Sequence, residues 1–194
     1  MIKGSCLCGG VKFEIRGSKG PFELCHCNRC RKATGSAFAA GLRVRGEDLR
    51  IVQGQELIKT FKAPIIDAPP PYTNRFCGRC GSPVPVPSDD ASWFEVPAGA
   101  LDDDPKIRPD KHIYIDFKSP WYSVSDGLPQ MTKSQIQASR RAVVSGKEIP
   151  FRPLSTRAAG RERQLQAIDA HGRQEPDGVR MRARRTARSA STDR

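Results

Sequence analysis

Seven cysteines in three short groups constrain the fold of this chain more than any other feature of its 194 residues. The groups read CxC, CxCxxC and CxxC, and they comprise Cys6 and Cys8, then Cys25, Cys27 and Cys30, then Cys77 and Cys80. Cysteines that only fill a core would be scattered along the sequence. Pairs at this spacing, in a chain with no visible secretion signal, are typical of metal sites. We therefore expect the chain to fold around bound metal.

The number of cysteines predicts one closed site and one open site. A closed structural zinc site needs four ligands, and the CxC and CxxC groups would each supply two from a tight turn. This site would join the N-terminus to the middle of the chain and contribute much of the stability. Its ligands would be Cys6, Cys8, Cys77 and Cys80. The CxCxxC group then remains, and three protein ligands with one open position are the pattern of a catalytic zinc.

The central cysteine group favours thiol chemistry. A zinc ion held by three thiolates carries a net negative charge and is a weak Lewis acid, so it suits the deprotonation of an exogenous thiol better than the activation of water. Arg31 and Lys32 directly follow the group, and we expect them to bind the carboxylates of an anionic thiol substrate. Cys25, Cys27 and Cys30 are thus the candidate catalytic residues.

Other interpretations of the cysteines stay open at this point. Disulfides are disfavoured by the odd number of cysteines, and an iron–sulfur site by spacings that do not match the ferredoxin runs. Two structural sites would require a fourth ligand for the central group. His112 and Asp116 are the distant candidates, whereas His26 lies too close to its neighbouring cysteines to join the same shell.

The remaining pattern of residues 1–139 predicts a mainly β domain, because short apolar runs recur about every ten residues between glycines and prolines. The predicted strands are Val11–Arg16, Phe38–Val44, Leu49–Val52, Leu57–Phe61, Trp93–Val96 and Ile113–Phe117. The strands Leu49–Val52 and Leu57–Phe61 flank Gly54 as a hairpin-like pair. Arg43 and Arg45 are expected to face outward from the strand Phe38–Val44.

Two further segments have clear local signals. Lys62–Tyr72 contains four prolines and is expected to be an irregular loop. Thr132 and Gln135 have the spacing of a capping box, which predicts a helix running towards Val144.

The C-terminal segment differs in composition from the rest. Residues 140–194 contribute +8 of the formal net charge of +12 and contain a single aromatic residue, Phe151. Such a segment cannot bury enough apolar surface to offset its ordering entropy. We expect a disordered extension, and nucleic acid is not expected as a partner because no aromatic side chains are interleaved for base stacking.

The sequence also predicts the cellular location. No apolar run approaches the roughly 20 residues of a membrane span, and the N-terminus shows no apolar signal region. We expect a cytoplasmic protein with no membrane contact. Nothing in the pattern indicates an oligomeric state.

Read together, the motifs resemble those of the glutathione-dependent formaldehyde-activating enzyme family, also called the centromere protein V family. The matching elements are GSCLCGG at residues 4–10, CHCNRCRKATGS at 25–36, RFCGRCG at 75–81, HIY at 112–114, KSPW at 118–121 and LPQ at 128–130. The resemblance covers residues 2–131. It implies that residues 2–131 form a zinc domain and that residues 132–194 form a helix and a basic low-complexity tail.

The resemblance implies a β-tent of small antiparallel sheets with zinc knuckles, here followed by a short C-terminal helix. It implies two zinc ions per chain, a structural one on the CxC and CxxC cysteines and a catalytic one on the CxCxxC group. The family's name-giving reaction is the reversible addition of the glutathione sulfur to formaldehyde, a carbon–sulfur lyase reaction. The expected partners of this chain are therefore a small thiol and a small aldehyde.

The sequence departs from the family pattern in two places. The segment Ser82–Pro87 is rich in proline, and the basic tail lies outside the pattern. A second hypothesis is a non-catalytic, zinc-stabilised binding module whose basic tail contacts nucleic acid. The three-cysteine group distinguishes the two, because a binding module has no use for an open coordination position.

Overall fold

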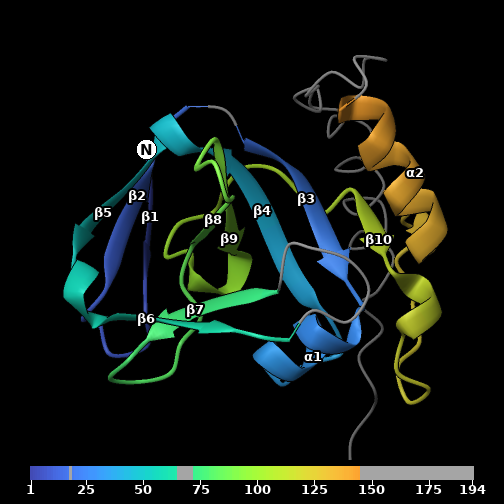
Figure 1. Cartoon of the computed structure of the whole chain (residues 1–194), viewed down its shortest axis with the longest axis horizontal. Coiled ribbons are helices and arrows are strands. Elements are labelled where there is room, and N and C mark those ends of the chain that lie inside the picture. The colour runs from blue at the N-terminus through green and yellow to red at the C-terminus, as the bar shows by residue number, and fades with distance from the viewer. Residues whose placement is uncertain (18, 65–71, 145–194) are drawn as a thin grey trace, which may run out of the picture. The chain divides into compact units, whose positions relative to one another are not determined.

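The computed structural model describes residues 1–17, 19–64 and 72–144 (Figure 1). They confirm a mainly β fold. The strands are β1 (Ile2–Ser5), β2 (Lys12–Ile15), β3 (Lys19–Cys25), β4 (Ala39–Arg45), β5 (Leu49–Gln53), β6 (Ile58–Lys62), β7 (Thr73–Cys77), β8 (Val86–Pro87), β9 (Trp93–Pro97), β10 (Lys111–Ile113) and β11 (Gln130–Met131). The two α-helices are α1 (Asn28–Thr34) and α2 (Lys133–Val144).

The strands form three sheets. A three-stranded sheet has the order β1-β2-β5, a six-stranded sheet the order β11-β10-β3-β4-β9-β8, and β6 pairs with β7. The ladders β1–β2, β3–β4, β6–β7 and β8–β9 between sequence neighbours are antiparallel. Strand β10 is parallel to both β3 and β11, so the larger sheet is mixed rather than purely antiparallel.

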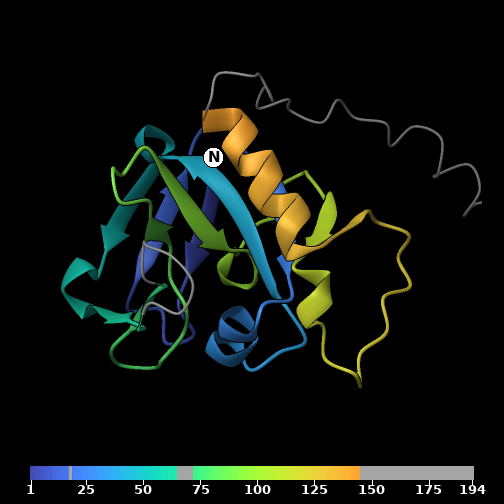
Figure 2. The same ribbon diagram turned by 45° about the vertical axis from the view of Figure 1, so that its right-hand side comes forward.

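The main core lies between the three-stranded and the six-stranded sheet. Alternate residues of each strand point into it, as the two-residue period of a strand requires. The buried members are Ile2, Phe13, Ile15, Phe22, Leu42, Val44 and Val96. The opposite face of the six-stranded sheet is covered by α2, which runs beside β3 and β10 in both ribbon views (Figure 1, Figure 2).

Several local predictions need correction. The segments around Gly54 do form strands, but β5 pairs with β2 and β6 pairs with β7, so they are not a hairpin. The predicted strand Ile113–Phe117 is divided: β10 ends at Ile113, and a 3₁₀ turn follows at Ile115–Phe117. Most of the proline-rich loop and the whole tail beyond residue 144 lie outside the described residues.

The capping box at the start of α2 is confirmed. The side-chain oxygen of Gln135 accepts a hydrogen bond from the backbone N–H of Thr132 at 2.8 Å, and the Gln135 N–H donates to the Thr132 hydroxyl at 3.4 Å. The Asp116 carboxylate accepts a hydrogen bond from the following backbone N–H, that of Lys133, at 3.1 Å. Asp116 therefore stabilises the start of α2, where unpaired N–H groups favour a negative charge.

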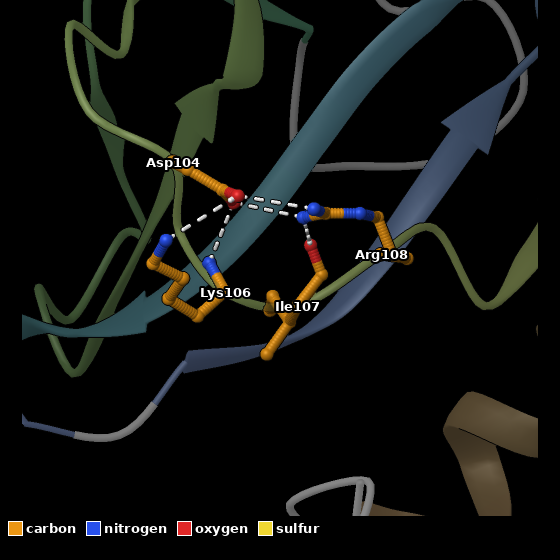
Figure 3. A network of polar contacts seen from close by, with 4 residues as sticks. All are labelled: Asp104, Lys106, Ile107 and Arg108. Carbon is orange, nitrogen blue, oxygen red and sulfur yellow. Dashed lines mark hydrogen bonds and ion pairs between the residues drawn. The ribbon is translucent and has the colours of Figure 1, made fainter. Parts of the chain in front are cut away.

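The connection that leads into β10 is held by one carboxylate (Figure 3). Asp104 accepts two hydrogen bonds from the Arg108 guanidinium, at 2.8 and 3.0 Å, and a third from the Lys106 N–H at 2.8 Å. These contacts, led by Arg108, lower the pKa of Asp104. They order a loop that contains the left-handed residue Lys106.

No helix among the described residues is long and apolar enough to cross a membrane.

Candidate active site

The structure brings the first and third cysteine groups together. The four Sγ atoms lie within 4.8 Å of one another, with Cys6 and Cys8 at 3.5 Å and Cys8 and Cys77 at 3.9 Å. Tetrahedral zinc with Zn–S bonds of about 2.3 Å places its ligand sulfurs about 3.8 Å apart. The donor set and its spacing therefore fit a tetrahedral thiolate site that joins the β1–β2 turn to the end of β7.

Local hydrogen bonds favour the thiolate form of Cys6 and Cys80 in this four-cysteine group. The Val11 N–H donates to Sγ of Cys6 at 3.2 Å, and Sγ of Cys80 lies 3.4 Å from the Ser82 hydroxyl. The Ser82 side chain and backbone together lower the pKa of Cys80 to about 5. Cys77 is fully buried and packs with Val11. Cys6 and Cys77 thus belong to a small hydrophobic core, Cys80 packs against it, and Cys8 is exposed.

The central group lies where β3 ends and α1 begins. The Sγ atoms of Cys25, Cys27 and Cys30 also lie within 4.8 Å of one another. Cys27 is the N-cap of α1, and its sulfur accepts the Cys30 N–H at 3.3 Å. Hydrogen bonds from the thiols of Cys25 and Cys30 lower the pKa of Cys27 to about 2. The same contacts raise the pKa values of Cys25 and Cys30, so the negative charge of the group gathers on the Cys27 sulfur.

The central group opens into a cavity of about 400 Å³. Four cations and two carboxylates line it, namely Arg29, Arg43, Lys133, Arg140, Glu23 and Glu95. The aromatic side chains in its wall are Tyr72, Tyr114 and Phe117. A concave site with an apolar wall, several polar groups and a cluster of thiols is the expected form of a small-molecule site.

Strand alternation explains which residues reach the cavity. Residues two apart in a strand share a face, so Glu23 and Cys25 of β3 point away from the main core, as do Gly41 and Arg43 of β4. Glu95 of β9 is the register partner of Arg43. Gly41 leaves room in the floor, since a Cβ there would lie 2.8 Å from the Glu95 carboxylate.

The cations of the cavity are held by different partners. The Arg43 guanidinium lies 4.2 Å from the centre of the Trp93 ring, a cation–π contact. Arg43 faces away from the core as predicted, but it lies in the cavity wall rather than in open solvent, and burial lowers its pKa. Arg29 donates to the Pro64 carbonyl at 3.2 Å. Burial raises the pKa of Glu95 despite the nearby positive charge of Arg43.

The two residues predicted to bind substrate lie on α1, outside the cavity wall. Arg31 donates to the Asn28 side chain at 2.6 Å and to the Ser119 hydroxyl. Lys32 is exposed. The cavity wall is built from other cations, and a substrate-binding role for Arg31 and Lys32 stays a prediction.

The distant candidates for a fourth ligand have other partners. Asp116 binds the start of α2, as described above. Both ring nitrogens of His112 are engaged: Nδ1 lies 2.8 Å from Nε2 of His26, and Nε2 lies 2.9 Å from the Asp126 carboxylate. The carboxylate can only accept, so it fixes the proton of His112 on Nε2 and that of His26 on Nε2. This gives an Asp126–His112–His26 chain in which the two histidines are buried and Asp126 is exposed.

This chain anchors the backbone of the central group. His26 lies in the sequence between the candidate ligands Cys25 and Cys27 and is fully buried. Its ring packs against Phe38 and Tyr122. Its backbone N–H donates a hydrogen bond to the Ile113 carbonyl at 2.9 Å. The contacts that hold His26 therefore also fix where the flanking sulfurs point.

Asp126→Ala is expected to lower the metal affinity of the central group by about tenfold, the lower end of the effect of losing a direct partner of a ligand, because Asp126 acts through His112 and His26. Asp126→Asn can still accept the His112 proton and should retain most of the affinity. Competition with a chromophoric chelator measures both, and the four-cysteine group of the same molecule is the control. Equal weakening at both groups, or by both variants, would contradict a positioning role.

Sequence reasoning missed Glu23, Glu95, Arg140 and the two cavity tyrosines. Their roles depend on strand register and on the placement of α2, which local patterns do not specify. One signal was present: Lys133, Ile136 and Arg140 share one face of the predicted helix.

Comparison with known proteins gives a consistent family. The sequence profile described as "Glutathione-dependent formaldehyde-activating enzyme" matches residues 1–117. A protein of Halomonas elongata, provisionally named as a glutathione-dependent formaldehyde-activating enzyme, is 32% identical over 130 residues, which are 64% of this chain and 81% of that protein. A crystal structure of a Rhodobacter sphaeroides protein aligns with a TM-score of 0.43 and 22% identity, over 67% of this chain and 99% of that one. The profile match and the Halomonas relative both show that this chain belongs to the glutathione-dependent formaldehyde-activating enzyme family.

Proposed function

We propose that this chain is a zinc-dependent carbon–sulfur lyase that adds a glutathione-like thiol to formaldehyde, reversibly, to give an S-hydroxymethyl adduct, a hemithioacetal. The observation that carries this proposal is the position of three cysteine sulfurs in the wall of a cavity that also holds four cations. Family membership supports the thiol and the aldehyde. The substrates named for the Halomonas relative fit the same chemistry.

We infer two zinc ions per chain. The four-cysteine group would hold a structural ion, and Cys25, Cys27 and Cys30 would hold a catalytic one with an open position. Zinc bound there would lower the pKa of a coordinated thiol and so supply a thiolate near neutral pH. Because thiolate ligands require reduced cysteines and all seven are free, we place the protein in a reducing compartment such as the cytoplasm.

The chain's own side chains would orient the aldehyde and manage its proton. In the reaction the thiol loses a proton, a carbon–sulfur bond forms, and the carbonyl oxygen gains a proton. Burial above all raises the pKa of Tyr72. Its hydroxyl therefore keeps its proton and can donate a hydrogen bond to the developing alkoxide. Ile113 and Phe117 would restrict water, and proximity would supply much of the rate.

The cations around the site would attract an anionic thiol. Arg29 and Arg43 lie in the cavity wall, whereas Arg31 and Lys32 lie on α1 outside that wall and would act by raising the local concentration of substrate. Such long-range attraction weakens as salt is added.

The zinc-loaded chain is expected to accelerate exchange between free formaldehyde and S-(hydroxymethyl)glutathione, measured by magnetization-exchange NMR at equilibrium. Removing only the more labile zinc with a mild chelator should return the rate to that of buffer. The second zinc and the circular dichroism spectrum should be unchanged. A rate equal to that of buffer in the fully loaded chain, for glutathione and for a panel of other thiols, would reject the enzyme and favour a binding module.

A further inference from the structure

Helix α2 contributes directly to the cavity although it lies beyond the family-matched residues 1–117. Lys133, Ile136 and Arg140 are spaced by three and four residues and therefore share one face of the helix. Ile136 is 2% exposed and packs with Cys25, Cys30 and Ile113. This contact fixes α2 against the cysteines, and Figure 2 shows the helix passing close in front of the sheet.

The guanidinium of Arg140 is held over the cavity by one ion pair. Its Nη2 lies 3.5 Å from the Glu23 carboxylate, which also accepts an ion pair from Lys111 at 3.3 Å. Lys111 has a second and closer partner, the Asp110 carboxylate at 2.8 Å, so the contact between Glu23 and Arg140 is the longest of the three ion pairs. The Arg140 side chain is 45% exposed, so most of its five N–H donors remain accessible to a ligand.

The charge of Arg140 acts across the whole cavity. Burial raises the pKa values of Glu95 on β9 and Tyr114 after β10, and in both cases the positive charge of Arg140 opposes the effect of burial. Arg140 therefore faces groups from several elements that surround the same space, rather than bulk solvent alone.

We propose that Arg140 is a specificity-determining residue, whose guanidinium binds a carboxylate of the thiol substrate at the end of the cavity formed by α2. The inference rests on the proposed function for the identity of the ligand as a thiol. The ligand class is a thiol with a carboxylate remote from its sulfur. Arginine suits this role because its planar fork of donors matches a carboxylate.

The test measures binding rather than turnover, with S-methylglutathione as the probe. This thioether keeps both carboxylates of glutathione and cannot react with an aldehyde. Calorimetric titration of the zinc-loaded chain is expected to show binding that Arg140→Gln weakens about tenfold to a hundredfold, the usual range for a charged hydrogen bond. Arg141→Gln is the matched control, because Arg141 is exposed and is rotated by about 100° on the same helix. Both variants must retain two zinc ions and the wild-type melting temperature.

A carboxylate-blocked probe completes the test. The dimethyl ester of S-methylglutathione should bind the wild-type chain as weakly as the acid binds Arg140→Gln, and the variant should not distinguish acid from ester. Equal effects of the two glutamine variants, the same loss for acid and ester, or no binding of the acid to the wild type would overturn the inference. If Arg140-dependent binding is found but no thiol is turned over, the proposed enzyme fails while this binding site stands.

Discussion

Replacing Cys27 with serine is expected to remove most of the turnover while the chain stays folded. Serine is a strong N-cap and its hydroxyl can still accept the Cys30 N–H, so α1 should keep its start. The sulfur on which negative charge gathers is lost, and two cysteines cannot hold a catalytic zinc firmly. We expect zinc to fall from two to one per chain and kcat to fall about a thousandfold, comparable to the loss of a main charge-stabilising group.

Elemental analysis and exchange NMR on the same preparation would measure this result. The melting temperature should change little, because Cys27 is only partly buried and its helix is short. Wild-type turnover in a chain that retains a single zinc would contradict the proposed role of the central group. Loss of both zinc ions would instead show that the two groups are not independent.

Replacing Cys77 with alanine is expected to have the opposite outcome, in which the fold itself is lost. Cys77 is fully buried, and its group joins residues that are about 70 positions apart in the sequence. Structural zinc contributes about 10 kcal/mol or more in small domains, which is comparable to the whole stability of a typical domain. Three cysteines could not replace that contribution, so the variant should lack a cooperative unfolding transition.

Circular dichroism and near-ultraviolet spectra during a thermal melt would measure the loss. Ser82→Ala is a milder companion variant, since it removes the hydroxyl beside Cys80 but no candidate ligand. It should lower the midpoint by a few degrees and keep both zinc ions. A Cys77→Ala chain that melts cooperatively near the wild-type temperature would show that the four-cysteine group does not support the fold.

The cysteine spacing and the strand pattern predicted much of this structure from sequence. Ligand counting separated the two groups, and the geometry brings together the same residues. Val11–Arg16 and Trp93–Val96 contain real strands because alternation is a local property of the chain. The capping box also fixed the start of α2 from four adjacent residues.

The predictions that failed concern features that depend on contacts between distant segments of the chain. Strand β5 pairs with β2 rather than with β6, and β10 is parallel to β3. Core packing rather than loop length decides these pairings. The outward face of β4 was assigned to solvent although α2 covers it. Arg43 and Arg140 were therefore not recognised as parts of one cavity, while Arg31, beside the cysteines in sequence, lies outside its wall.

The two cysteine groups differ in how far apart their members lie along the chain, and this sets the order in which metal is acquired. The central group spans six residues and can meet an ion while the rest of the chain is still unstructured. The other group must close a loop of about 75 residues, which by the logarithmic dependence on length is less favourable by about 2 kcal/mol. During synthesis its last ligands also emerge about 50 residues later. The nascent chain would therefore bind metal at the central group first, and metal binding at the four-cysteine group would coincide with the completion of folding.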